Sequence, residues 1–313
     1  MRAWGPTADP ENPIALAEVD APTPAAHEVL LQVEAFSVNR GETFLLESPQ
    51  PDWRPGKDVA GTVLREAADG SGPARGQRVV GHPPSRGWAE QVAVSTDALA
   101  VLPDTVATAT AAALPLAGIT ALRLLRLVSP LPGRRLLLTG ASGGVGHYLT
   151  ELAVAGGAQV TAVVANPGRG ARLGSFGAQV VTSVRDAGDE FDAALESVGG
   201  DSLPAVLERV RGGGLVVWFG QASRQPVTLD FFHLLRRTPS VSLRQFDYTD
   251  GLAYQHDLTT LVRLVDKGHL HPEIGRIADW SNTQDVLVDL RQRQIRGKAV
   301  LTIPAPTTQK SAS

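Results

Sequence analysis

Short runs of alternating or apolar residues, separated by clusters of turn-forming residues, characterise the chain up to about residue 106. Turn signals rich in Pro, Gly and Ser lie between these runs, for example at 68–77. Strands of this length and spacing are typical of a compact β-barrel or sandwich, so we predict a β-rich unit here. The runs expected to form its strands are EVLLQVEAFSV (28–38), VAGTVL (59–64), RVVG (78–81) and AEQVAVS (89–95).

The hydrophobic period changes after residue 107. Residues 108–128 carry apolar residues at helical spacing, although Pro115 and Gly118 are expected to break this helix into two pieces. From residue 136, fully apolar runs alternate with helical stretches, which is typical of a parallel sheet covered by helices on both faces. The strands expected in this sheet are 136–139, 159–164, 179–181, 192–197 and 214–220, with helices over 145–155 and up to about 176.

The remaining residues return to mixed structure. A helix is expected over about 258–267 and a closing strand over 298–303, and the tail 304–313 is expected to be disordered. Taken together, these patterns predict an α/β protein in which a parallel sheet is combined with a β-rich unit.

Composition narrows the class of protein. The chain has 313 residues, of which 43% are hydrophobic and 19% charged, and a formal net charge of −3 argues against a nucleic-acid partner. No apolar window is long enough to span a membrane, and the N-terminal residues do not resemble a signal peptide. There is no cysteine, which excludes disulfides, thiolate nucleophiles and cysteine-ligated metals. We therefore expect a soluble, cytoplasmic, globular protein.

A glycine-rich turn between a predicted strand and a predicted helix is the sharpest motif. The segment LLLTGASGGVGHYLTELA (136–153) contains the pattern Ala141-x-Gly143-x-x-Gly146. Small residues at this spacing let the backbone turn tightly and approach a pyrophosphate, whose charge is favoured at a helix N-terminus. The motif predicts a dinucleotide site.

The residues after the second strand of this sheet indicate which dinucleotide. A cofactor without a 2′-phosphate is bound by an acid about 20 residues past the glycines, and here that position holds Asn166. Arg169 and Arg172 follow on the same loop, and a guanidinium is suited to a 2′-phosphate. The pattern favours NADPH over NADH, although both arginines are also explained as solvated surface residues.

The same glycine-rich turn fits a rival reading. Residues 140–144 read Gly-Ala-Ser-Gly-Gly, which matches the nucleophile elbow of serine hydrolases. Ser142 would then be the nucleophile, with His256 as base and Asp230 or Asp247 as acid. The long β-rich region before the motif argues against this reading.

Several short blocks in order make the sequence resemble the medium-chain dehydrogenase/reductase superfamily, specifically its zinc-free quinone oxidoreductase branch. The resemblance implies a Rossmann domain (113–250), a doubly wound parallel sheet, inserted into a GroES-like catalytic domain (1–112 and 251–303). It also implies NADPH as cofactor and a homodimer formed by edge-to-edge extension of the Rossmann sheets through 227–246. The blocks that carry the resemblance include VEAFSVNRGE (33–42), GKDVAGTV (56–63), AAALPLAGITAL (111–122), TGASGGVG (139–146), ESVGG (196–200), GGGLVVWFG (212–220) and RGKAVLTI (296–303).

The resemblance also assigns roles to single residues. It implies that Asn39 lies beside the nicotinamide, that Thr120 faces the cofactor, and that Arg169 binds the 2′-phosphate. Val198 and Gly220 match strand-end positions that border the nicotinamide ribose and ring. The pyrophosphate loop of the family is matched by Ser142, Gly143, Gly144 and Val145.

Two departures from the family bear on the chemistry. The Gly-His-Glu segment of zinc alcohol dehydrogenases is Gly56-Lys57-Asp58 here, and without cysteine we expect no catalytic zinc. Phe44 stands where many relatives carry a tyrosine on the substrate side.

These residues predict an NADPH-dependent, metal-independent oxidoreductase that transfers hydride to a quinone or an α,β-unsaturated carbonyl. The candidate donors to the developing negative charge are Asn39 and Lys57, although Lys57 is also explained by a structural pair with Asp58 or Glu42. An enoyl-thioester reductase of the same fold and a non-catalytic NADP-binding protein remain as alternatives. The aromatic residues expected to border a flat substrate, besides Phe44, are Trp53, Trp88, Phe246 and Tyr248.

Overall fold

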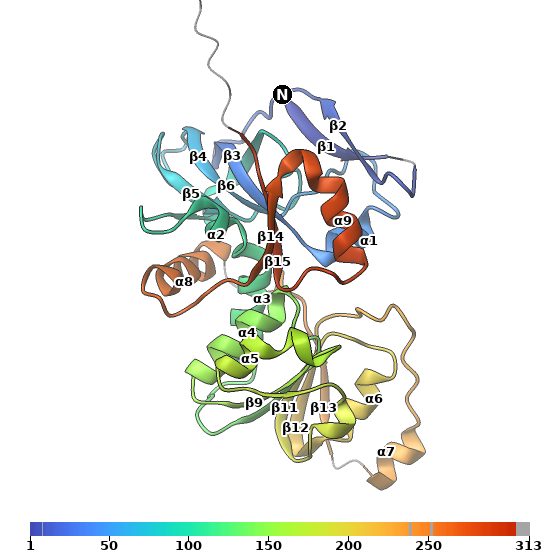
Figure 1. The fold of residues 1–313 in the computed structure, drawn as a ribbon. Helices are drawn as coiled ribbons and strands as arrows, with labels where there is room; N and C mark the ends of the chain where they lie inside the picture. The colour runs from blue at the N-terminus through green and yellow to red at the C-terminus, as the bar shows by residue number, and fades with distance from the viewer. Residues whose placement is uncertain (8, 238–239, 251–252, 305–313) are drawn as a thin grey trace, which may run out of the picture. The chain divides into compact units, whose positions relative to one another are not determined.

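The computed structural model describes residues 1–7, 9–237, 240–250 and 253–304. The chain divides into two compact units (Figure 1). Unit 1 comprises Met1–Leu116 with Ala253–Ser313, and unit 2 comprises Ala117–Leu252. The sequence placed these boundaries at residues 112 and 250. The expectation of a disordered tail falls on residues that, after Pro304, lie outside the described part of the chain.

Unit 1 is built on a mixed sheet in which β3 is the longest strand. The side chains of β3 alternate between buried and half-buried along most of its length, as its sequence pattern predicted. The order of the sheet is β14-β15-β3-β4-β5-β7, β6 also pairs with β3, and β1 and β2 form a separate antiparallel pair. The strands are β1 Arg2–Pro6, β2 Ile14–Glu18, β3 Glu28–Val38, β4 Asp58–Arg65, β5 Arg78–Gly81, β6 Gln91–Ser95, β7 Leu99–Val101, β14 Ile274–Asp279 and β15 Lys298–Thr302.

The helices of unit 1 are short, apart from those contributed by residues after 253. Pro115 begins α3 (Pro115–Leu127), which crosses from unit 1 into unit 2, and a proline is well suited to a first helical position. Gly118 was expected to break this helix but lies inside it. The cost of one helical glycine, about 1 kcal/mol, is small against the burial of neighbours such as Ile119. The other helices are α1 Arg40–Leu45, α2 Thr108–Ala112, α8 Tyr254–Asp266 and α9 Thr283–Arg291.

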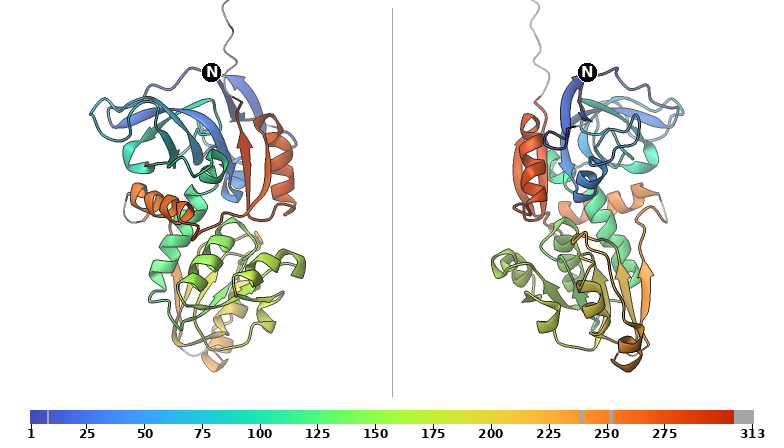
Figure 2. Two further views of the ribbon diagram at one scale, coloured as in Figure 1. Left: turned by 60° about the vertical axis from the view of Figure 1, so that its left-hand side comes forward. Right: turned by 90° about the vertical axis from the view of Figure 1, so that its right-hand side faces the viewer.

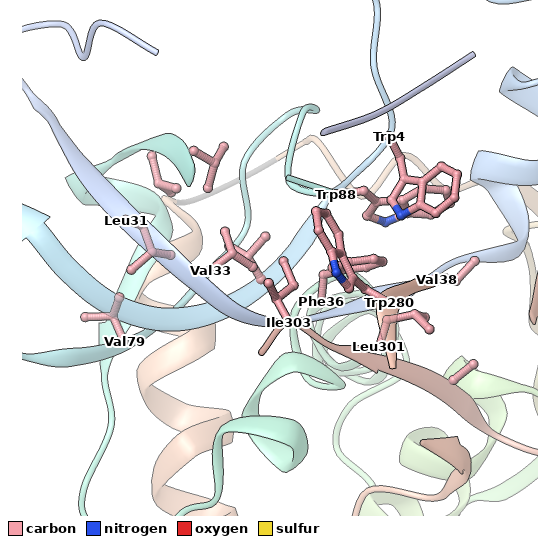
Figure 3. Close-up of a cluster of buried hydrophobic side chains, with 14 of the residues drawn as sticks. Trp4, Leu31, Val33, Phe36, Val38, Val79, Trp88, Trp280, Leu301 and Ile303 are labelled. Atoms are coloured by element: carbon pink, nitrogen blue, oxygen red, sulfur yellow. The ribbon is translucent and has the colours of Figure 1, made fainter. Parts of the chain in front are cut away.

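The core of unit 1 is an apolar cluster that includes three tryptophans, Trp4, Trp88 and Trp280 (Figure 3). Trp88 is fully buried and stacks on Phe36, with their ring centroids 5.7 Å apart. Its indole Nε1 donates to the carbonyl oxygen of Ser37 at 3.4 Å. Trp53 packs against the same cluster from a partly buried position.

Unit 2 is a parallel sheet in the order β10-β9-β8-β11-β12-β13. The chain therefore starts in the centre, winds to one edge, returns and winds to the other, which is the order of a doubly wound nucleotide-binding fold. The predicted α/β class with a parallel sheet is confirmed. The strands are β8 Arg135–Leu138, β9 Gln159–Val163, β10 Gln179–Val181, β11 Phe191–Glu196, β12 Val210–Trp218 and β13 Ser242–Gln245.

Helices connect these strands, as the alternating pattern predicted. They are α4 Gly144–Ala155, α5 Ala171–Ser175, α6 Ser202–Leu207 and α7 Phe231–Arg237. A long connection leads from β12 to α7, which lies at the margin of unit 2 in every view (Figures 1 and 2). Among the described residues, no helix is long and apolar enough to cross a membrane.

Candidate dinucleotide and active site

The carboxyl ends of the parallel strands place most of the predicted cofactor residues at one edge of the unit 2 sheet. The glycine-rich turn follows β8, Asn166 and Arg169 follow β9, and Val198 follows β11. Gly220 comes two residues after β12. In doubly wound sheets, ligands bind outside the carboxyl ends of the strands where the winding direction reverses, which here is between β8 and β11.

The glycine-rich turn is tightly packed at one position. A Cβ at Gly146 would lie 2.4 to 2.6 Å from backbone atoms of Ala141, so only glycine fits there. Gly143 is the N-cap of α4, and a Cβ there would meet only the carbonyl oxygen of Gly140, at 3.3 Å. The first amides of a helix have no acceptor within the helix, so the N-terminus of α4 offers Gly144 and Val145 N–H groups to an anion.

Arg169 and Ser142 come together beside this turn. The Arg169 Nε donates to Ser142 Oγ at 3.2 Å. Asn166 is exposed and precedes the single helical turn that carries Arg169, and no acidic residue lies in the sequence 164–174. Arg172 is half-buried, with its guanidinium 5.6 Å from the ring centroid of Phe176. The loop that follows β9 therefore carries positive charge.

A buried carboxylate that sequence reasoning missed organises the third strand end. Glu196 is fully buried at the end of β11 and accepts hydrogen bonds from the amides of Val198 (2.9 Å) and Gly199 (3.1 Å). The hydroxyl of Thr139, next to the glycine-rich turn, donates to the same carboxylate at 3.1 Å. The signal for Glu196 was an acid near the end of the run 192–197, and the carboxylate ties the ends of β8 and β11 together.

The remaining predicted residues of unit 2 are placed as follows. Thr120 is buried within α3. Phe246 directly follows β13 and its amide donates to the carbonyl oxygen of Trp218 at 2.9 Å. The Tyr248 carbonyl oxygen accepts from Arg123 at 2.6 Å, and the side chains of Phe246 and Tyr248 are half-buried.

The contacts of Ser142 do not support the alternative prediction of a serine hydrolase. Within the part of the chain that the structure describes, Ser142 Oγ bonds to Arg169 rather than to a histidine. Asp230 and Asp247 are engaged locally instead, by the amides of Phe232 and Thr249 respectively.

In unit 1, Asn39 lies in a buried cluster of charged and polar side chains. It is the N-cap of α1, where its backbone amide donates to Glu42 Oε2 at 2.9 Å. Its side-chain Nδ2 donates to Asp58 Oδ2 at 2.8 Å and to Glu42 Oε2 at 3.3 Å. Its Oδ1 accepts from the ammonium of Lys298. The amide of Asn39 is therefore fixed in one orientation by three neighbours.

Asp58 and Lys298 form the ion pair at the centre of this cluster. Asp58 Oδ2 lies 3.0 Å from Lys298 Nζ and also accepts from the hydroxyl of Ser37 at 2.6 Å. Asp58 Oδ1 accepts the Leu116 amide at 2.8 Å and lies 3.6 Å from His82 Nδ1. Although burial opposes ionisation, these partners, with Lys298 the foremost, hold the pKa of Asp58 well below its usual range.

Glu42 is the second buried carboxyl of the cluster, and its environment raises its pKa, whereas that of Asp58 is lowered. Burial, followed by the negative charge of Asp58, raises the pKa of Glu42 to about 7. Its Oε1 accepts from the amides of Gly56 (2.8 Å) and Lys57 (3.1 Å), so it fixes the loop that precedes β4. A carboxyl that titrates near neutral pH thus lies one contact away from both predicted catalytic residues.

The pairing with Asp58 that the sequence allowed for Lys57 is made by another lysine. The buried lysine paired with Asp58 is Lys298, not Lys57. Lys57 contributes its backbone amide to Glu42 and its carbonyl oxygen to His82 Nδ1 at 2.7 Å, and its side chain is half-buried. Sequence reasoning missed Lys298, whose only signal was a lysine at the start of the apolar run 298–303.

Trp88 was expected to border the substrate, and this prediction is wrong. It is part of the core of unit 1, because its two-ring surface is better buried than exposed, and it offers no face to a ligand (Figure 3). Trp53 is partly buried against that core. Phe44 is half-buried on α1, with the Arg40 guanidinium 5.8 Å from its ring centroid.

Over the described ranges of the chain, no group of three or more His, Cys, Asp or Glu side chains is arranged to hold a metal ion.

Comparison with known proteins agrees with this fold. The family of zinc-binding dehydrogenases matches residues 176–301. The rat quinone oxidoreductase-like protein 2 is 26% identical over 94% of this chain and 90% of its own length. The mouse quinone oxidoreductase is 27% identical over 82% and 83%. Among solved structures, the quinone oxidoreductase of Escherichia coli complexed with NADPH has a TM-score of 0.86 at 22% identity, covering 96% of this chain and 99% of that one.

The doubly wound sheet of unit 2, the β-rich unit 1 and these similarities together support the fold of the medium-chain dehydrogenases/reductases. The similarity to quinone oxidoreductases supports the resemblance to that branch derived from the sequence blocks.

Proposed function

We propose that this protein is an NADPH-dependent oxidoreductase that transfers hydride to a quinone or an α,β-unsaturated carbonyl. The observation that carries the cofactor assignment is Arg169, which lies against Ser142 of the glycine-rich turn at a strand end that holds no acid. The E. coli relative complexed with NADPH supports the same cofactor.

The residues that would hold NADPH all belong to the strand ends of unit 2. The amides of Gly144 and Val145 would bind the pyrophosphate, and the guanidinium of Arg169 would bind the 2′-phosphate, with Asn166 and Arg172 beside it. Val198 and Gly220 would border the nicotinamide half. When bound, NADPH supplies the hydride.

The residues of unit 1 would orient the acceptor and stabilise the negative charge that develops on its oxygen. Both hydrogens of Asn39 Nδ2 are directed at carboxylates, so its amide helps to fix the geometry of α1 and the 56–58 loop. Lys57 sits on that loop, with its backbone held by Glu42 and His82, and its ammonium is the candidate donor to the acceptor oxygen. One such donor contributes ~2–4 kcal/mol of transition-state stabilisation.

Replacing the arginine tests the cofactor assignment. We expect Arg169→Ala to raise the Kd for NADPH by about 10- to 100-fold while changing the Kd for NADH much less, because only NADPH carries the 2′-phosphate. Fluorescence titration with both coenzymes gives the two constants. Arg185→Ala, an exposed arginine after β10, is the matched control. An unchanged preference in Arg169→Ala would remove the cofactor argument.

The acceptor is tested by NADPH oxidation with quinones, enones, enoyl thioesters and simple aldehydes. Turnover with the first two supports the proposed reaction, and turnover with thioesters alone favours an enoyl-thioester reductase. Binding of NADPH without turnover of any acceptor would leave only a nucleotide-binding role.

We also propose that the protein is a homodimer through one edge of unit 2. β13 is the last strand in the order of the sheet and all four of its side chains are exposed. The neighbouring α7 exposes Phe231 (70%), Phe232 (77%) and Leu235 (81%), and exposed apolar side chains clustered in this way favour a partner surface. Pairing of two β13 edges would satisfy the strand and cover α7 at the same time.

A further inference from the structure

Two loops of unit 1 run side by side and bring two arginines together. The Arg86 amide donates to the Arg54 carbonyl oxygen at 2.9 Å, and the next amides along the loop bond to Pro55 and Gly56. The Arg86 Nη2 donates to the Asp52 carbonyl oxygen at 2.9 Å. The contact is closely packed, since a Cβ at Gly56 would lie 2.2 Å from the backbone nitrogen of Gly87. The backbones of Arg54 and Arg86 are therefore held as neighbours.

The positive charges of this arginine pair are not neutralised by the protein. Within the described residues, neither Arg54 nor Arg86 forms a salt bridge, and the buried Nη1 of Arg54 has no hydrogen-bond partner. Burial, and then the charge of Arg86, lower the pKa of Arg54. A buried donor without an acceptor is destabilising and uncommon in native proteins, so this group calls for an explanation.

The arginine pair also lies close along the chain to the candidate catalytic loop. Arg54 precedes Lys57 by three residues, and a chain of that length spans about 10 Å at most. Gly56 and Lys57 are fixed by Glu42. The backbones of Arg54 and Lys57 therefore lie within the length of a small molecule of each other.

We infer that Arg54 and Arg86 bind an oxyanion of the substrate, a carboxylate or a phosphate, so that the acceptor is an anionic quinone or enone. A guanidinium presents donors in a planar fork that matches both oxyanions, and an anion would satisfy Nη1 of Arg54 and relieve the repulsion between the two charges. The inference rests on the proposed function and narrows its substrate class. Arg86 is exposed, so an anion from solvent contacts it directly, whereas the buried Nη1 of Arg54 must be uncovered before the same anion reaches it.

The test compares pairs of acceptors that share one enone and differ in whether they carry a negative charge, and the arginine variants correct for differences in intrinsic reactivity within each pair. Initial rates of NADPH oxidation are measured with trans-4-oxopent-2-enoate and with its methyl ester, and with a phosphorylated hydroxy-enone and its free alcohol. We expect the wild-type protein to prefer the charged member of one pair, and that pair identifies the oxyanion. Arg54→Gln and Arg86→Gln should each lower the ratio of kcat/KM for the charged over the neutral member by about 10-fold or more (~1.4 kcal/mol).

Two controls guard this comparison. Arg75→Gln replaces an exposed arginine on another loop of unit 1 and should leave the ratio unchanged. Arg86→Lys keeps a positive charge and should recover part of the preference. If Arg54→Gln does not fold, the substrate ratios of Arg86→Gln and Arg86→Lys test the inference without it, because Arg86 is exposed.

The outcomes separate the inference from the function on which it rests. Equal rates with both members of each pair, or ratios that the arginine variants do not change, would overturn the inference and leave the oxidoreductase intact. If no acceptor is reduced, the proposed function fails. Calorimetric binding of trans-4-oxopent-2-enoate to the wild type and to Arg86→Gln then decides the anion site: weaker binding by the variant supports it, and equal binding refutes it.

Discussion

At the scale of the residue, Lys298 and Asp58 form an ion pair from which water is almost excluded, with exposed side-chain fractions of 3% and 0%. Removing one member of such a pair leaves the other charge buried without compensation. We expect Lys298→Met to lower the free energy of unfolding by about 3–5 kcal/mol, measured by urea denaturation at pH 7.

A surface lysine provides the control for this loss. Lys267 pairs with Asp266 from a side chain that is 66% exposed, so Lys267→Met should change stability by less than about 1 kcal/mol. Equal losses in the two variants would contradict a special role for the buried pair. Because Lys298 also bonds to Asn39, Lys298→Met should lower the rate of hydride transfer more than Lys267→Met does.

Glu42 predicts a pH dependence of stability. Its ordinary pKa is 4.5 and in the folded protein it is raised to about 7, so the folded state binds more protons than the unfolded state between these values. The contribution is complete below pH 4.5 and is lost as the pH rises through 7. We expect the free energy of unfolding to fall by about 2–3 kcal/mol from pH 5 to pH 8.

A neutral replacement isolates this carboxyl. Glu42→Gln cannot ionise, so its stability should depend less on pH over the same interval, although the variant keeps only one of the two acceptor oxygens used by Asn39 and Gly56. Glu18→Gln, at an exposed position on β2, should keep the dependence of the wild type. A wild-type protein whose stability does not fall between pH 5 and 8 would refute the raised pKa.

Single residues also mark the limit of what the sequence could predict. Asn39 and the 56–58 loop were found by resemblance, but Lys298 was missed because it meets Asp58 across 240 residues of chain. Trp88 was named as a substrate-bordering residue although simple packing was the more probable explanation for each of these aromatic residues taken singly. Only the packing against Phe36 separates these readings.

At the scale of the element, the turn between β8 and α4 has less room for a side chain at Gly146 than at Gly143. We expect Gly146→Ala to destabilise unit 2 by about 1–3 kcal/mol, because its Cβ meets the backbone of Ala141, which has no freedom to move away. Thermal or urea unfolding measures this loss, together with the Kd for NADPH.

Gly143→Ala is the matched control, since its Cβ meets a single atom at 3.3 Å and its backbone has a φ of −83°. We expect it to cost less stability than Gly146→Ala. Equal losses would show that the turn is not limited by the contact at Gly146.

Long or fully apolar elements were the predictable ones. β3, the strands β8, β9, β11 and β12 and helix α4 follow from apolar runs and periodicity, because burial on both faces of a parallel sheet leaves a clear pattern. Elements such as β7, with three residues, and α1 and α6, with six each, are too short to show a period. They are set by contacts made elsewhere in the fold.

At the scale of the whole molecule, the proposed dimer gives a direct prediction. We expect the wild-type protein to elute at twice the monomer mass in size-exclusion chromatography with light scattering. The double variant Phe232→Glu and Leu235→Glu should be monomeric, because charges on the exposed face of α7 oppose its burial.

Val288→Glu serves as the control for this change. Val288 is 42% exposed on α9, which belongs to unit 1 and is not part of the proposed interface, so this variant should remain dimeric. A wild-type monomer, or a dimer that survives both charges on α7, would contradict the proposed interface.

The position of β15 in the sheet of unit 1 has a consequence for synthesis. This strand pairs with β3 and with β14, so the unit that begins at the first residue is completed only when residues 298–302 are available. All six strands of unit 2 are translated by residue 245. On the ribosome, the middle of the polypeptide can therefore reach its native state while its earlier part still awaits a strand, which reverses the N-terminal-first order common among multidomain proteins.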